Sequence, residues 1–201
     1  MNSEANDIVV EAILSAERQR IGNEIRVMRR KIERRDQVTL EQIALALDVS
    51  VDQFLGWQRG TNGPTITGWT RLRALFLDTI RIRPGSWTLQ VSPEVQDLSF
   101  DDVIADQQVS VGTELRGTIA RIKARFAVSS PQLAHAIGVT ERLLGYWRNG
   151  ASAPRIREMA ILRCLEASRL RIQWVETDRA HPYLVPGIQA GTPSPARGEG
   201  Q

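Results

Sequence analysis

The sequence lacks the residues and spacings on which most enzymes depend. Its one cysteine, Cys164, cannot form an internal disulfide and supplies no zinc site. Its two histidines, His135 and His181, share no nucleophile or acid pattern, and neither a glycine-rich phosphate loop nor a metal-ligand spacing occurs. We therefore predict that the protein is not an enzyme and that it uses no cofactor and no metal.

Long apolar runs are also missing from the 201 residues, so we expect no membrane span and no membrane partner. No Lys or Arg precedes Arg18, whereas a secretory signal needs a basic region ahead of its apolar residues. The expected location is therefore the cytoplasm. Hydrophobic residues make up 42% of the chain, which is enough for one or two compact cores, although only 5% of the residues are aromatic.

What the sequence does contain is an internal repeat, in which residues 22–83 and 112–173 align without gaps at a constant offset of 90. Identical pairs in this register include Gly22 with Gly112, Glu24 with Glu114, Arg26 with Arg116, Arg35 with Arg125, Gln42 with Gln132, Trp57 with Trp147, Gly60 with Gly150, Pro64 with Pro154 and Arg73 with Arg163. Chance similarity would not keep one register over this length. The repeat therefore predicts two tandem domains of one fold, residues 22–83 and 112–175.

The remaining segments differ in composition from the repeats. Residues 84–111 carry acidic residues and no Lys or Arg, which predicts an acidic linker with a short strand at 87–91. Residues 1–21 predict an amphipathic helix with Ile8, Val9, Ala12, Ile13 and Ala16 on one face, serving either as a strap over the first domain or as the contact of a homodimer. Residues 170–175 are expected to end the last helix. Residues 176–201 are expected to form a tail, disordered from about residue 187 because Gly, Pro, Ser, Thr and Ala dominate there.

Residues 139–150 predict a short capped helix with two different faces. Thr140 can cap its start and Gly150 can close its end, while Leu143, Leu144 and Trp147 share an inward face. A second short helix precedes it, with Ser130 as cap, Pro131 at the first helical position and Gly138 at its end. Two short helices therefore meet at a glycine turn.

In this region the sequence resembles the helix-turn-helix of the Cro and phage-repressor family, also called the xenobiotic-response-element type. The matching features are Leu115, Arg116 and Arg125 of a basic first helix, Gln132-Leu133-Ala134, Gly138-Val139-Thr140, Trp147, Gly150 and Pro154. The resemblance implies an all-α protein of two tandem repressor-like domains, with about five helices each and the third helix in the DNA major groove.

The outward residues of the second repeat favour base reading. Glu141, Arg142, Gly145 and Tyr146 would face the base edges, and Arg142 could bond both the O6 and the N7 of a guanine. By family position, Ser130, Gln132, Arg148 and Asn149 would contact phosphates. The alternative is that Tyr146 and Arg148 are simply solvated.

The first repeat presents a more apolar and acidic surface, formed by Val51, Asp52, Leu55, Gly56 and Arg59. Its DNA candidates are Arg29, Arg30, Asp52 and Arg59, of which the arginines would bind phosphates without reading sequence. Two alternatives stay open: the basic residues of its first helix form a solvated face, or Val51 and Leu55 bind a protein partner.

These features predict a sequence-specific regulator of transcription that binds double-stranded DNA, with repression the commoner outcome in the family. One alternative is a protein-interaction module or antiactivator built on the same fold. Another is an architectural or excision factor of a mobile element, which would bind adjacent direct repeats and bend the DNA.

Overall fold

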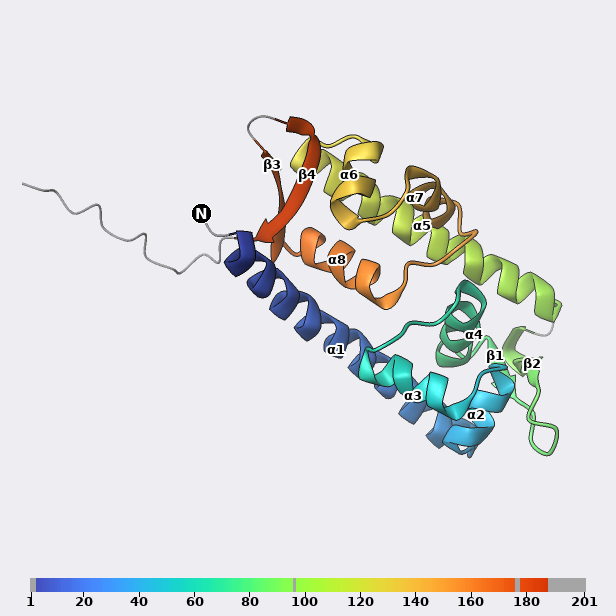
Figure 1. Cartoon of the computed structure of the whole chain (residues 1–201). Coiled ribbons are helices and arrows are strands. Elements are labelled where there is room, and N and C mark those ends of the chain that lie inside the picture. Colours follow the sequence, from blue (N-terminus) through green and yellow to red (C-terminus); the bar gives the residue numbers. More distant parts are fainter. Residues whose placement is uncertain (1–2, 96, 176–177, 188–201) are drawn as a thin grey trace, which may run out of the picture.

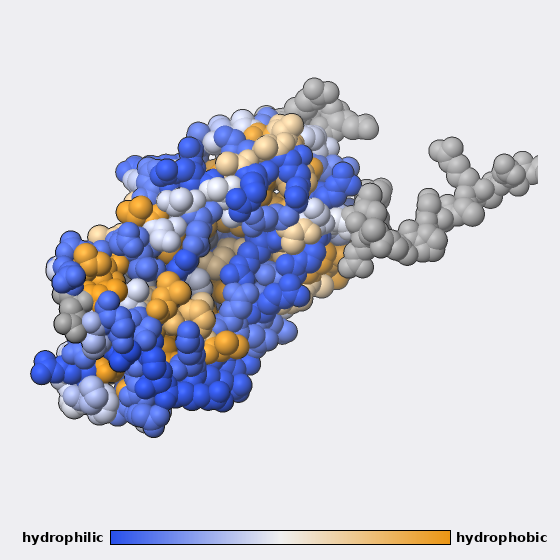
Figure 2. Space-filling model, turned by 180° about the vertical axis from the view of Figure 1, so that it is seen from behind, coloured by the Kyte–Doolittle hydropathy of each residue, from blue (hydrophilic) through white to orange (hydrophobic). Residues whose placement is uncertain are grey.

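The computed structural model describes residues 3–95, 97–175 and 178–187. This part of the chain is mostly helical, with two small two-stranded antiparallel sheets. Seen from behind, its surface is mostly hydrophilic, with smaller hydrophobic areas (Figure 2). The first half comprises α1 (Ser3–Asp36), α2 (Leu40–Ala46), α3 (Val51–Arg59), α4 (Ile66–Phe76), β1 (Ile80–Ile82), β2 (Leu89–Val91) and the short 3-10 helix η1 (Pro93–Val95). The second half comprises α5 (Phe100–Phe126), α6 (Ser130–Ile137), α7 (Glu141–Arg148), α8 (Ile156–Glu166), β3 (Leu170–Val175) and β4 (Asp178–Pro186). No helix in the described residues is both long and apolar enough to cross a membrane.

The secondary structure recurs at the offset of 90. The helices α3 and α7 begin one residue after Ser50 and Thr140, whose hydroxyls accept from the amides of Gln53 and Leu143. Gly60 and Gly150, which follow these helices, have left-handed backbones with φ of 70° and 71°. A hydroxyl cap therefore starts α3 and α7, and a left-handed glycine follows each of them, in the same way in both halves.

The amino-terminal helix and the first helix of the repeat are one continuous helix, because the 34 residues of α1 contain no proline or cap that would interrupt them. Its buried face differs from the one expected. Leu14, Glu17 and Ile21 are buried, whereas Ile8 and Val9 are 67% and 46% exposed, and Ala12 and Ala16 are exposed as well. Only Ile13 of the predicted face packs on the core, so that assignment was wrong.

The predicted linker is mostly folded. Its strand forms, slightly shorter than expected, as β2, which pairs with β1 in the register Ile80 with Val91 and Ile82 with Leu89. Ser99 then caps α5 in a capping box with Asp102, so residues 100–111 belong to a long helix. Phe100, Val103 and Ile104 pack on the hydrophobic core.

The expectation of about five helices in each repeat was wrong, because a hairpin takes the place of the last helix in both halves. Residues 170–175 form β3 rather than the end of a helix, and 178–186 of the predicted tail form β4, which pairs with it from Leu170 with Pro186. Alternation of buried Leu170 and Ile172 with exposed Arg171 and Gln173 explains the strand. The disorder predicted from about residue 187 falls on residues 188–201, which lie outside the described range.

The two halves exchange equivalent contacts. Helix α1 packs on α3, α4 and α8, and α5 packs on the counterparts α7, α8 and α4. Figure 1 shows α1 and α5 running in opposite directions along two sides of the molecule, with α8 and α4 between them. The guanidinium of Arg73 bonds the carboxylate of Glu114, and Arg163 bonds Glu24 at 2.7 Å, which is the same pair with the halves exchanged. The bond from Arg73 holds the pKa of Glu114 below its ordinary value.

Candidate nucleic-acid interface

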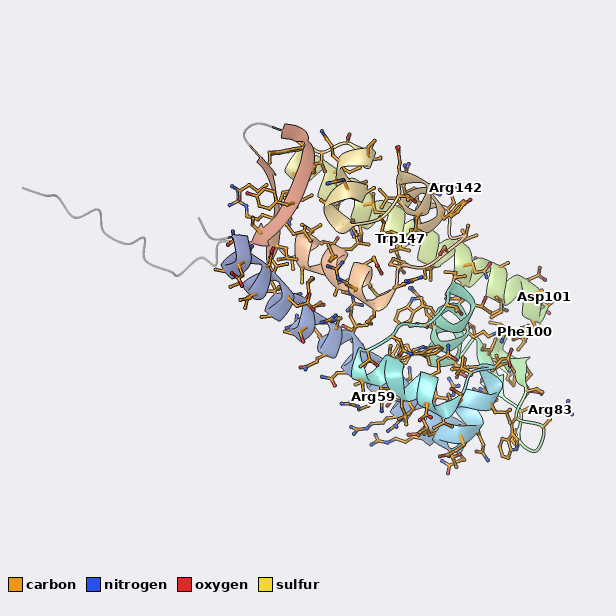
Figure 3. The ribbon with its side chains drawn as sticks, in the orientation of Figure 1. Arg59, Arg83, Phe100, Asp101, Arg142 and Trp147 are labelled. Carbon is orange, nitrogen blue, oxygen red and sulfur yellow. The ribbon has the colours of Figure 1, made fainter. Side chains whose placement is uncertain are left out.

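Helix α7 has a buried side and an exposed side, as its sequence predicts. Leu144 and Trp147 are each 1% exposed and lie in the core. Glu141 and Arg142 are exposed in the first turn, after the Thr140 cap. Figure 3 shows Arg142 on the outside of α7 and Trp147 on the side toward α8. The burial of Trp147 fixes the rotation of the helix, and this rotation presents Arg142 to solvent.

The side chain of Arg142 is held by Tyr146, one turn further along α7. Its Nε donates to the Tyr146 Oη at 2.6 Å, and its guanidinium carbon lies 5.4 Å from the centre of the tyrosine ring. This contact leaves both terminal nitrogens of the guanidinium without a partner in the described structure. Tyr146 itself is 39% exposed, so the pair forms a small, partly ordered polar surface.

The centre of the outer face of α7 is open. An added Cβ on Gly145 would meet nothing within 4 Å, so a ligand can approach the backbone closely there. The first half is different at the corresponding turn. A Cβ on Gly56 would lie 2.1 Å from the Asn62 Oδ1, because the Asn62 side chain covers this glycine. Gly56 is buried, and the expectation that it points outward was wrong.

The residues predicted to contact phosphates occupy both ends of the α6–α7 pair. Ser129, rather than Ser130, caps α6, and Gln132 completes the capping box by accepting from the Ser129 amide at 2.8 Å. The cap was misplaced by one residue because two serines adjoin; Ser129 matches Thr39, which caps α2 in the same way. Ser130 instead accepts from the Lys123 ammonium at 2.8 Å, which places a cation beside the start of α6.

Arg148 and Asn149 lie at the other end of the pair, and both are exposed. The Arg148 carbonyl accepts from two nitrogens of Arg116, at 3.2 and 3.1 Å, while its own guanidinium has no partner in the described part of the chain. In the first half Arg26 makes the same kind of bond to the Gln58 carbonyl at 3.3 Å. Arg26 and Arg116 therefore support the ends of α3 and α7, and they are poor candidates for phosphate binding.

The first-half candidates are less well placed. Asp52 and Arg59 are exposed on α3, as expected, but Val51 packs partly on the core and Leu55 is half-buried. On α1, Arg29 is engaged with Glu33 at 3.4 Å. Arg30 is exposed and unpaired within the described residues. Of the two arginines predicted on α1, only Arg30 is therefore free to bind phosphate. The exposed Asp52 and Arg59 of α3 carry opposite charges, so the face of α3 is nearly neutral.

Two cations near α7 were missed by the sequence reasoning. Arg155 and Arg157 are exposed at the start of α8, and neither has a partner among the residues the structure describes. They follow the loop that leaves α7, and they line a groove with the equivalent loop of the first half, residues 61–66. The repeat alignment could have identified them, because at the offset of 90 Arg155 and Arg157 correspond to the uncharged Thr65 and Thr67. These two added charges distinguish the second repeat from the first at positions where the fold is shared.

Comparison with known proteins gave no further information. No family model, curated protein or solved structure matches the chain.

The described residues contain no group of His, Cys, Asp and Glu that could hold a metal ion. Cys164 is buried, and burial raises the pKa of its thiol, so it is a poor nucleophile at neutral pH. The exposed face of α7 instead offers hydrogen-bond donors and acceptors, an open backbone and unpaired cations. This combination suits a polyanionic partner with an irregular polar surface.

Proposed function

We propose that this protein is a sequence-specific DNA-binding regulator of transcription, built from two helix-turn-helix domains of the Cro and phage-repressor type. Helix α7 is the base-reading helix of the second domain. The observation that carries the proposal is the outer face of α7, where Arg142 is ordered by Tyr146 beside the open Gly145. The protein would act in the cytoplasm as a repressor, by occupying an operator.

The shape and chemistry of α7 fit the major groove. This groove is about 12 Å wide, accepts one α-helix and presents different donors and acceptors for each base pair. The two terminal nitrogens of Arg142 can donate together to the O6 and N7 of a guanine. Glu141 can accept from a cytosine amino group. Tyr146 restricts Arg142 before binding, which lowers the entropy lost when the contact forms.

Cations around α7 provide the phosphate contacts. Arg148 ends α7 itself, while Arg155 and Arg157 lie at the start of α8. The Lys123 ammonium of α5 lies beside Ser130 at the start of α6. Each phosphate that they neutralise releases counterions, so affinity should fall steeply with salt. Replacing Arg155 and Arg157 by alanine should reduce the slope of log affinity against log salt by about 2, for every DNA sequence alike.

The proposal is tested by selecting DNA from a random double-stranded library with the full chain. The first variant replaces Glu141 and Arg142 by alanine. The matched control is Arg83→Ala, which removes a cation from the hairpin of β1 and β2, far from α7 (Figure 3). An enriched motif that the control keeps and the α7 variant loses supports base reading. A motif that survives the loss of Glu141 and Arg142 contradicts it.

The face of α3 favours a second candidate, an interaction module that binds a protein through Leu55 and its neighbours. Leu55 is half-buried but does not pack on the core, and the residues around it carry little net charge. If this second role were the principal one, the protein would select no DNA motif, and any DNA affinity would depend weakly on salt.

A further inference from the structure

We infer that one chain binds one DNA site as an internal dimer, with α7 and α3 on two unlike half-sites in inverted orientation. The inference rests on the proposed function and specifies the DNA that this site recognises. Its basis is the relative orientation of the two halves in the structure. The sequence alone does not determine this orientation.

The contacts between the halves are reciprocal. Arg73 of the first half bonds Glu114 of the second, and Arg163 of the second bonds Glu24 of the first. The packing of the helices is reciprocal as well: α1 of the first half packs on α8 of the second, and α5 of the second packs on α4 of the first. When residue i contacts j and the counterpart of j contacts the counterpart of i, the two units are related by a two-fold axis. Head-to-tail units, which would bind direct repeats, lack this reciprocity.

The two-fold axis passes between the loops that follow α3 and α7. Residues 61–66 and 152–158 line one groove, and a Cβ on Gly63 would lie 2.9 Å from the Ile156 amide nitrogen. The carboxyl ends of α3 and α7 therefore both approach the axis, and the helices extend away from it in opposite senses. An inverted pair of helices matches the two-fold symmetry of duplex DNA, as it does in repressor dimers.

The junction of the halves contains fixed contacts as well as the chain connection. Glu17 of α1 is 2% exposed and pairs with Arg169 of the second half at 2.6 Å. Trp69 and Met159, at matched positions, line a cavity of about 350 Å³ between the halves, together with both Arg–Glu pairs. Contacts of this kind set one distance between α3 and α7, so the spacing of half-sites should be narrowly defined.

The half-sites should differ because the two faces differ. At the offset of 90, Arg142 corresponds to Asp52, Tyr146 to the covered Gly56, and Arg155 to Thr65. The half-site under α7 gains base reading and phosphate contacts, whereas the one under α3 meets an acidic residue that can accept from cytosine. The operator would therefore be an inverted repeat with a strong half and a weak half.

The test starts from the DNA motif selected by the full chain. Three probes keep its first half-site and carry the second half-site as an inverted repeat, as a direct repeat, or with a randomised sequence. Inserting about 5 base pairs, roughly half a helical turn, between the halves gives a fourth probe, since it turns one half to the opposite face. We expect the inverted probe to bind at least about tenfold more tightly than the other three, the effect of losing one or two correctly read base pairs. Sedimentation velocity should find one chain per duplex.

Two variants assign the halves. Arg142→Ala should relax base preference in the strong half alone, and Asp52→Ala in the weak half alone. A motif confined to one half-site, a direct repeat or two chains per duplex would overturn the inference while leaving the proposed function standing. Absence of any selected motif would overturn both, so the two failures are distinguishable.

Discussion

Replacing glycine by alanine should have opposite effects at Gly112 and Gly145, although both glycines lie inside helices. In an exposed helix interior, alanine is favoured over glycine by about 1 kcal/mol, because glycine loses more backbone freedom on folding. Gly145 has open space at its Cβ position, so Gly145→Ala should stabilise the fold by up to about 1 kcal/mol. At Gly112 a Cβ would lie 2.7 Å from the Gly150 nitrogen and 2.9 Å from its Cα.

These two atoms of Gly150 are backbone atoms and cannot move aside like the end of a side chain. Overpacking of this kind costs about 1–3 kcal/mol. Both variants gain the same helix propensity, so the difference between their free energies of unfolding measures the cost of the clash at Gly112. This difference should be about 1–3 kcal/mol. Urea unfolding followed by tryptophan fluorescence measures both, provided that the slope m is unchanged. A Gly112→Ala protein as stable as Gly145→Ala would refute the close approach of α5 to the turn after α7.

The other predictions concern the core, one ion pair and the cysteine. Trp147→Ala should cost about 3–5 kcal/mol, because the side chain is 1% exposed, and a melting curve like that of the native protein would contradict its burial. The folded pKa of Glu114 is lowered, so its contribution to stability is present above the ordinary glutamate pKa and lost as the pH falls through the lowered value. The stability difference between the native protein and Glu114→Gln should therefore shrink as the pH is lowered from 6 to 3, and a constant difference would exclude the Arg73 bond as its cause. Cys164 is 0% exposed and its thiol pKa is raised, so iodoacetamide should label it slowly in the folded protein and rapidly in urea; prompt labelling without urea would show that it is accessible.

Much of the helical structure followed from local signals. The caps Thr140 and Ser50, the left-handed glycines after α3 and α7, and the inward Trp147 are encoded within a few residues of where they act. Such features are readable from one sequence because their energetics are local. Ser129 and Ser130 mark the limit, since by sequence either hydroxyl could cap α6. In the structure Ser129 caps the helix and Ser130 accepts from Lys123.

The features that sequence reasoning missed depend on contacts between distant segments. The pattern at Ile8, Val9, Ala12 and Ala16 is a good amphipathic face, but α1 turns its Leu14 and Glu17 side toward the second half. Residues 170–175 follow α8 after a turn at residues 167–169, and they form a strand because residues 178–186 supply the partner. Neither choice is determined by propensity, because tertiary contacts decide which face is buried and which segment is paired.

The positions that the two halves share and those that differ fit a tethered two-fold arrangement. Arg73 and Arg163, with Glu114 and Glu24, are identical across the repeat, because each pair closes the same contact from the other side. Glu17 departs from this rule: its counterpart is the buried Gln107, and its partner Arg169 corresponds to Thr79. A buried carboxylate needs its cation, so these changes could be accommodated only as a set. In a homodimer both copies would carry every substitution, whereas in one chain each half changes alone. The covalent connection therefore allows α7 to carry Arg142 and Tyr146 while α3 carries Asp52 and a covered Gly56.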